Sequence, residues 1–429
     1  MMQVNALKSV LLGVHSNESD AFINISNGVP VLQYRESVLC PHITIDLNVT
    51  DVGTAANADN GERGTIGLLE AIKLQGSEKF KLFMEDKNGN KIDLSGENDL
   101  RISKTVFAEA TANTSSCFVQ VVSKEAFDNT LEENRMRDYY LGKGDVIIRS
   151  ALDSLKTEKD LFADTTELEM EFNGGKRYPF EMCCDVQKVS IPPGIDSAGY
   201  LFWETSRGFN FRSLDGMFDT SGKVIKKFCE TGFGDTKLPV GFDGKILKSS
   251  FVLVNDMLKQ FEDGGYNINL DLFNTTSKTR FQVIPRTTPE EGNGIIAGTQ
   301  MPVVNPDYQN KITDSIFRDN DTGQTIIPGR SLQDTITEEK FSINRTSTQA
   351  HTNYRQKFSS SLNIVIDADL SLSAGDLVFC NFPQTAKKTS KERSFKSSGI
   401  YMIADLCHYS TPTKAFTGLN LVRDSYGVK

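Results

Sequence analysis

The chain has 429 residues, of which 38% are hydrophobic and 24% charged, and it carries a net charge of −9. This length predicts two to four domains, each able to bury a core, and the acidic balance argues against nucleic-acid binding by bulk charge. No run of eighteen apolar residues occurs, and the apolar patch near the start is too short for a signal peptide. We therefore expect no membrane segment and a protein made and kept in a cytoplasm.

The region up to Ser123 is predicted to be a β-domain. The stretch from His42 to Val52 alternates apolar and polar residues, as expected of a half-buried strand. Asn88-Gly89 predicts a tight hairpin. The same loop resembles a calcium site from Asp86 onwards, but Lys91 stands where that site needs glycine, so the hairpin is favoured. Further strands are expected at 21–25, 31–34, 79–84, 91–94 and 117–122.

The apolar spacing changes from strand-like to helical after Ser123. Ser123 can cap a helix whose apolar positions recur as far as Tyr139. Glycines at 142 and 144 interrupt that pattern. Asp145 then begins a second predicted helix, with an apolar face made by Ile147, Ile148, Ala151, Leu152 and Leu155.

The densest aromatic cluster lies between Ala198 and Phe218 and contains the only tryptophan, Trp203. The pattern predicts two strands across a turn at 206–208, then a short helix capped by Ser213. Phe209 and Phe211 are expected in the core of this hairpin. The alternative is an exposed platform that stacks nucleic-acid bases, with Arg207 and Arg212 beside it.

Residues 286–330 are rich in Gly, Pro, Asn and Thr and predict a long connection between domains. Within it, 319–323 looks like part of a calcium loop but lacks the closing acid, so a turn is expected. Residues 387–396 concentrate positive charge. They are predicted to form a solvated loop, or else a contact with an acidic partner or DNA phosphates.

The last stretch, from Ser361 to Ser425, predicts a small antiparallel β-domain. Leu362, Ile364 and Ile366 alternate with polar or outward positions, which is typical of a strand with one buried face. Turn residues separate three further apolar runs. These runs cover 377–379, 399–406 and 415–423.

The sequence contains little that indicates catalysis. Seven cysteines are scattered in apolar contexts without a CxxC pair, which favours buried thiols over disulfides or zinc. No P-loop, GxSxG or HExxH motif occurs, and the four histidines have no metal spacing. We expect no catalytic, metal or cofactor site, although paired carboxylates of a hydrolase remain possible on sequence grounds.

Two segments resemble one protein family. The C-terminal order, from SLNIVID through AGD and SGIYMIADLCHY to LNLVRDS, resembles the hub proteins of contractile-tailed phage baseplates, T-even-like myophages in particular. The aromatic segment FWETSRGFNFRSLDGMF is similar to a hairpin and helix of the same hubs. The resemblance marks Trp203, Phe209, Phe211, Arg423 and Asp424 as structural or interface residues.

The resemblance implies a mainly β fold with two tail-tube-like antiparallel β-barrel domains, at 1–123 and 341–429, and a helical and mixed α+β middle region with a long linker at 124–340. It implies a trimer that forms a pseudo-sixfold ring between tail tube and central spike. The implied partners are the spike, tail tube and tube-adaptor proteins and baseplate wedge proteins, with DNA passing through unbound. The virion baseplate, assembled in the host cytoplasm, would be its location. A different tube or baseplate part, or a tail-associated wall hydrolase, is the alternative.

Overall fold

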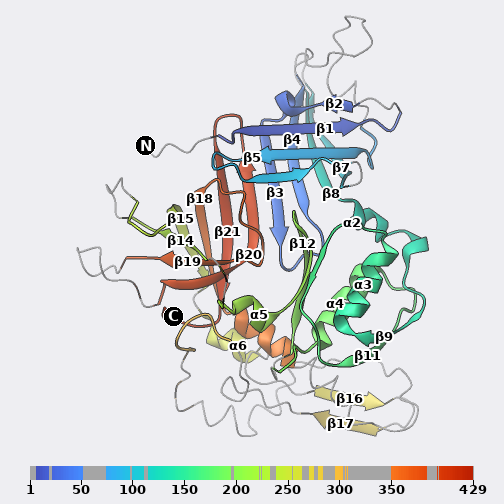
Figure 1. Ribbon diagram of the computed structural model, residues 1–429, viewed down its shortest axis with the longest axis vertical. Helices are drawn as coiled ribbons and strands as arrows, with labels where there is room; N and C mark the ends of the chain where they lie inside the picture. Colours follow the sequence, from blue (N-terminus) through green and yellow to red (C-terminus); the bar gives the residue numbers. More distant parts are fainter. Residues whose placement is uncertain are drawn as a thin grey trace, which may run out of the picture.

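The computed structural model describes residues 6–18, 22–51, 74–96, 99–110, 115–194, 198–221, 223, 225–231, 238–253, 255–262, 270–274, 279–283, 295–302, 305, 307, 349–383, 394 and 396–428. Within these residues the chain is mainly antiparallel β-structure, as predicted, with helices beside and below the strands (Figure 1). Most of residues 303–348 and 384–395 lie outside the described part. The expected turn at 319–323, and all but Ser394 and Lys396 of the basic stretch 387–396, therefore fall outside it as well.

The N-terminal strands form an antiparallel sheet in the order β3-β4-β8-β7-β5-β1-β2, with β6 paired to β5. Figure 1 shows β1 and β5 crossing in front of β3 and β4, and the apolar residues of both layers share one core. The strand expected at 42–52 is confirmed, with Ile45, Leu47 and Val49 buried. The strands are β1 (Ser9–His15), β2 (Phe22–Asn24), β3 (Val31–Ser37), β4 (Thr44–Asp51), β5 (Lys79–Glu85), β6 (Lys91–Leu94), β7 (Leu100–Ala110) and β8 (Ser115–Ser123), with a 3-10 turn η1 (Ser26–Gly28).

The hairpin predicted between β5 and β6 is confirmed. Gly89 has a φ of +83°, a conformation that glycine adopts without strain. The Asp86 carboxylate accepts hydrogen bonds from the backbone N–H groups of Asn88 and Asn90, both at 2.9 Å. Its other oxygen accepts one from the N–H of Leu370 at 3.1 Å. The acid that suggested a calcium loop thus closes the turn and ties it to the C-terminal part.

The four predicted C-terminal strands are confirmed, and they belong to a closed barrel of six strands. The ring runs β19-β14-β15-β18-β21-β20 and returns to β19. Two of its strands, β14 and β15, come from the expected middle region 124–340 and not from 341–429. The strands are β14 (Lys226–Cys229), β15 (Gly244–Leu253), β18 (Ser360–Asp367), β19 (Leu377–Asn381), β20 (Gly399–Ser410) and β21 (Ala415–Arg423).

Strand β20 joins the barrel to the N-terminal sheet. Its first residues pair with β19, and its second half, from Asp405 to Ser410, pairs antiparallel with β3. A register shift between Ile403 and Asp405 separates the two halves, and such bulges bend a strand and increase its twist. The two β regions therefore form one continuous sheet and share an apolar core.

The helix expected from Ser123 to Tyr139 is wrong beyond its first turns. Helix α2 ends at Asp128, and the side chains of Thr130 and Asn134 donate hydrogen bonds to the carbonyls of Phe127 and Asp128 at that end. Tyr139 instead begins a strand, β9, that pairs with β11 thirty residues later, so a tertiary pairing overrides the local spacing. The second predicted helix is confirmed as α3, with its predicted apolar face buried.

The middle region places these elements around one hairpin. Strands β12 and β13 pair antiparallel, and β10 adds to β13 in parallel. Figure 1 shows α3 and α4 on one side of this hairpin and the barrel on the other. The elements are α2 (Lys124–Asp128), η2 (Glu132–Asn134), β9 (Tyr139–Lys143), α3 (Gly144–Ser154), β10 (Leu161–Ala163), β11 (Glu169–Asn173), α4 (Pro179–Val189), β12 (Tyr200–Thr205), β13 (Gly208–Ser213), α5 (Leu214–Phe218), α6 (Met257–Glu262), β16 (Leu270–Asn274) and β17 (Thr279–Val283).

Candidate functional site

The β12–β13 hairpin is buried on both faces, and the two faces meet different neighbours. Because side chains alternate along a strand, Phe202 points with Phe209 and Phe211 toward α3 and α4. Leu201 and Trp203 point the other way, toward the barrel. The hairpin therefore lies between the helical layer and the barrel and packs against both.

The predicted core role of the aromatic residues is confirmed. Phe209 and Phe211 are completely buried, so the exposed stacking platform is excluded. Phe209 stacks on Phe202 with ring centroids 5.6 Å apart, and Phe211 stacks on Tyr200 at 4.6 Å. The predicted cap is also present, since the Ser213 hydroxyl accepts a hydrogen bond from the N–H of Gly216.

Trp203 is fixed against the loop between β18 and β19. Its indole N–H donates a hydrogen bond to the carbonyl of Ala374 at 3.0 Å. The next residue, Gly375, has a φ of +90°, and a Cβ there would lie 2.5 Å from the indole ring. Only glycine fits between this loop and the hairpin.

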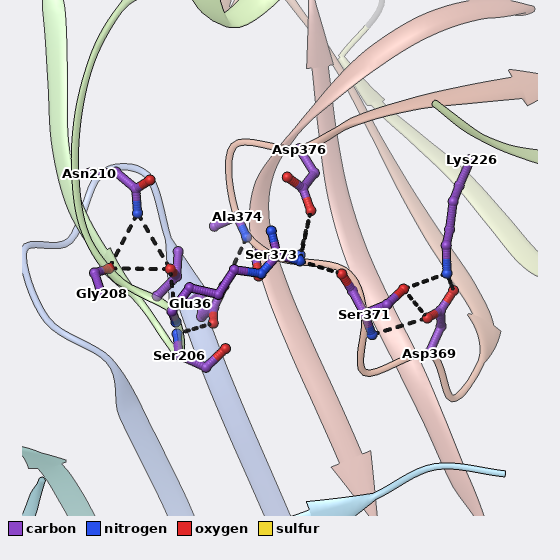
Figure 2. Close-up of polar contacts among 12 residues, drawn as sticks. Glu36, Ser206, Gly208, Asn210, Lys226, Asp369, Ser371, Ser373, Ala374 and Asp376 are labelled. Carbon is purple, nitrogen blue, oxygen red and sulfur yellow. Dashed lines mark hydrogen bonds and ion pairs between the residues drawn. The ribbon is translucent and has the colours of Figure 1, made fainter. Parts of the chain in front are cut away.

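Glu36 on β3 lies where three parts of the chain meet, and its side chain is buried. One carboxylate oxygen accepts hydrogen bonds from the Tyr34 hydroxyl at 2.6 Å and from the N–H of Ser206 at 2.9 Å. The other accepts one from the N–H of Ala374 at 2.9 Å. Figure 2 shows these contacts between hairpin turn and barrel loop. One carboxylate thus fixes the N-terminal sheet, the hairpin and the barrel relative to one another.

Burial raises the pKa of Glu36 to about 7, although the hydrogen bonds from Tyr34, Ser206 and Ala374 lower it. Among the described residues no cation pairs with this carboxylate, so only neutral donors oppose the loss of hydration. Burial, followed by the neighbouring Glu36, raises the pKa of the Tyr34 phenol. The stability of this junction therefore depends on whether the Glu36 carboxyl is protonated.

A second buried carboxylate, Glu204 at the end of β12, ties the hairpin to the N-terminal sheet. Lys159 lies 2.6 Å from both Glu204 and Glu125, and the N–H of Ile43 donates to Glu204 at 3.1 Å. Burial raises the pKa of Glu204, opposed by Lys159. This cluster again joins segments that are distant in the sequence.

The structure places Arg423 and Asp424 in the interior at the end of β21. The Arg423 guanidinium lies 4.4 Å above the Tyr401 ring and donates to the carbonyl of Ser398 at 3.2 Å. Asp424 lies 2.8 Å from Lys357, which also lies 3.1 Å from Asp215 on α5. Burial lowers the pKa of Lys357, but Asp424 and then Asp215 outweigh it, so the net shift is upward.

The five residues singled out from the sequence do not form one cluster. Phe209 and Phe211 belong to the helix-facing core, and Trp203 to the barrel-facing core. Sequence reasoning missed Glu36, Glu204 and Lys357. The local sequence around each of them does not indicate burial, because the segments that cover these side chains lie far away in the chain.

A pocket of about 490 Å³ opens beside the Glu36 junction, between the hairpin and the loop before β19. Trp203 and Met217 contribute apolar surface, and Ala374 and Gly375 form part of the loop wall. Its charged lining residues are Arg207, Arg212, Lys223, Lys226 and Asp376. The loop wall is internally bonded, as Figure 2 shows for the contacts of Ser371 and Ser373 with their neighbouring acids.

The described residues include no group of three or more His, Cys, Asp or Glu side chains arranged to hold a metal ion. The seven cysteines are free, and four of them, Cys117, Cys183, Cys229 and Cys380, are buried. Burial raises the pKa of Cys183, which disfavours the reactive thiolate. Within the described part, no helix has the length and apolar character needed to cross a membrane.

Comparison with known proteins shows a shared fold along nearly the whole chain. A 43 kDa tail protein of a prophage from Shewanella oneidensis has 10% identity and a TM-score of 0.52, covering 97% of this chain and 98% of its own. A tail protein from Neisseria meningitidis has 9% identity and a TM-score of 0.50, covering 97% and 96%. No family model and no curated protein sequence matches the chain. The chain therefore has the fold of these two tail proteins.

Proposed function

We propose that this protein is a structural component of a contractile tail and acts as the central hub of its baseplate. The observation that carries the proposal is the likeness of fold to two tail proteins over 97% of this chain. In the proposed role, the hub links the tail tube to the central spike as a trimer. Its partners are the spike, tube, tube-adaptor and wedge proteins, and its location is the virion baseplate after assembly in the host cytoplasm.

The architecture supports a trimer because each chain offers two β regions side by side. A closed barrel and an N-terminal sheet share strand pairing through β20 and β3. Three such chains can present six β lobes, which matches a sixfold tube on one side and a threefold spike on the other. The residues Trp203, Phe209, Phe211, Arg423 and Asp424 are proposed to hold each chain rigid within the ring.

The mass of the protein in solution tests this proposal. One chain has a mass of 47.6 kDa, so native mass spectrometry of the purified protein should give three times that value. Six copies would favour the alternative of a tail-tube or other baseplate component. A stable monomer at micromolar concentration would contradict the hub proposal.

We also propose that DNA passes through the ring without being held. Each lysine or arginine that neutralised a phosphate in the bore would release counterions and add binding free energy. A conduit should therefore be lined by acidic and small polar groups, in keeping with 56 acidic and 47 basic residues. Duplex binding measured as a function of salt should be weak at physiological ionic strength, and tight binding there would contradict the conduit.

The alternative from another class is a wall-cleaving tail enzyme with buried carboxylates. Incubation with purified peptidoglycan separates the two proposals. We expect no fragment release. Release that disappears when one carboxylate pair is replaced by amides would favour the enzyme.

A further inference from the structure

The pocket beside the Glu36 junction has an apolar interior and a basic rim. Trp203, Met217 and Leu377 are buried around it, while Phe162 and Ile225 contribute partly exposed apolar surface. Its volume of about 490 Å³ is within the usual range for a site that takes a small ligand or a few residues of peptide. The walls are formed by β10, the hairpin, α5, the start of β14 and the loop before β19. The pocket is therefore built by elements that belong to the fold itself.

Four of the five charged residues that line this pocket are basic, and the fifth is Asp376. Lys226 pairs with Asp369, and Arg207 lies 3.7 Å from Asp376 while donating to the carbonyl of Ser371. Lys223 donates to the carbonyl of Gly216 at 2.9 Å. That contact leaves its charge without a carboxylate within ion-pair distance among the described residues.

Arg212 is the lining cation without a direct polar contact, although it is near enough to Asp376 to oppose, after Arg207, the burial that raises the pKa of that carboxyl. Strand β13 carries it on the pocket side, and in the described part of the chain its guanidinium has neither a hydrogen bond nor an ion pair. It is close enough to Lys223 for mutual repulsion: burial, and then Arg212, lowers the pKa of Lys223, while Asp219, Asp164 and Asp376 oppose this shift. Two like charges beside a partly apolar cavity are stabilised by an anion that enters between them.

We propose that this pocket binds an acidic peptide segment of a partner protein, with a carboxylate on Arg212 and Lys223 and a neighbouring apolar side chain against Met217, Ile225 and Phe162. A guanidinium can bind a carboxylate through two parallel hydrogen bonds, which fixes orientation as well as charge. Only the source of this peptide, another tail component, rests on the proposed function. The site itself rests on the charges and walls described.

A nucleic acid fits this pocket less well than a peptide does. Single-stranded nucleic acid needs exposed aromatic faces, but Trp203 is 1% exposed and Gly375 covers its ring. A duplex would also meet a chain with a net charge of −9. A single carboxylate next to an apolar side chain matches both the local excess of positive charge and the apolar walls.

The protein carries its own reporter of the site, because its single tryptophan lines the pocket. We would titrate the full chain with the peptide acetyl-Gly-Phe-Glu-Phe-Asp-Gly-amide and follow the Trp203 emission. The neutral twin, with Gln and Asn in place of Glu and Asp, tests the charge. Acetate and inorganic phosphate test whether any small anion suffices.

The proposal expects saturable binding of the acidic peptide and at least about tenfold weaker binding of its neutral twin, because charge-assisted bonds are lost. Arg212→Gln should weaken the acidic peptide by about tenfold as well. Arg149→Gln, on the exposed side of α3, is the matched control and should bind as the parent does. Circular dichroism and the native mass of both variants establish that they are folded and assembled.

Four results would overturn the proposal, three of them in the comparison of ligands and variants. They are equal binding of both peptides, an Arg212→Gln variant that binds like the parent, or acetate and phosphate binding as tightly as the acidic peptide. Absence of any emission change up to millimolar acidic peptide, with calorimetry also silent, overturns it too. Failure of the trimer measurement would contradict the hub proposal and leave these binding results intact, so the two failures are distinguishable.

Discussion

The two faces of the β12–β13 hairpin are held by different chemistry. The helix-facing side packs Phe202, Phe209 and Phe211 in an apolar core, which ends where Lys159 pairs with Glu204. The barrel-facing side combines Trp203 with the buried carboxylate of Glu36, which receives hydrogen bonds from the hairpin turn and from the barrel loop. Apolar packing holds the hairpin in place, and directional polar contacts fix its register against two remote segments.

The largest expected effect is on the apolar face. Replacing Phe211 with Ala leaves a cavity in a close-packed core and should lower the free energy of unfolding by about 3 to 5 kcal/mol. We expect mostly insoluble protein. Phe107→Ala is the matched control, because Phe107 is 65% exposed, and chemical denaturation of both variants gives the comparison. Soluble Phe211→Ala protein of native stability that fails to assemble would place the residue at an interface.

On the polar side, buried and exposed ion pairs should differ sharply. Lys357→Met leaves Asp215 and Asp424 facing each other without a cation and should cost about 3 to 5 kcal/mol. Lys8→Met breaks a pair in which the lysine is 60% exposed and should cost at most about 1 kcal/mol. Urea denaturation at pH 7 measures both. Equal costs would mean that the Lys357 cluster contributes no more than a surface pair.

The Glu36 junction should give stability a distinctive pH dependence. Its pKa is about 7 in the folded chain, above the ordinary value of 4.5. The folded state therefore binds the proton more tightly, so the contribution is fully present below pH 4.5 and is lost as pH rises through 7. Relative to the Glu36→Gln variant, the parent's free energy of unfolding should fall by about 3 kcal/mol as the pH rises over that range. A difference that stays constant from pH 4.5 to 8 would contradict the burial argument.

The apolar cores were open to sequence prediction, and the buried carboxylates were not. Alternation at Leu362, Ile364 and Ile366 predicts a strand because one buried side leaves a period of two in the residues themselves. The aromatic spacing of the hairpin and the Ser213 cap are local in the same sense. The structure confirms these features, and each of them depends only on a few residues that are neighbours in the sequence.

Glu36 shows why the rest escaped prediction. On β3 it is a charged residue within a strand, and its burial depends on Ser206 and Ala374, which lie 170 and 338 residues further along the chain. Barrel closure has the same cause: β14 has only four residues, and its pairing with β19 joins Lys226 to Val378. Long-range pairing of this kind leaves no periodic pattern in a short segment.

The central claim is that the protein forms a threefold ring with two β regions per chain. Electron-microscopy class averages of the purified assembly test this claim most directly. We expect rings of three chains, each contributing two lobes, so that six lobes surround an open channel. A ring of six chains with one lobe each towards the channel, or particles without a channel, would contradict it.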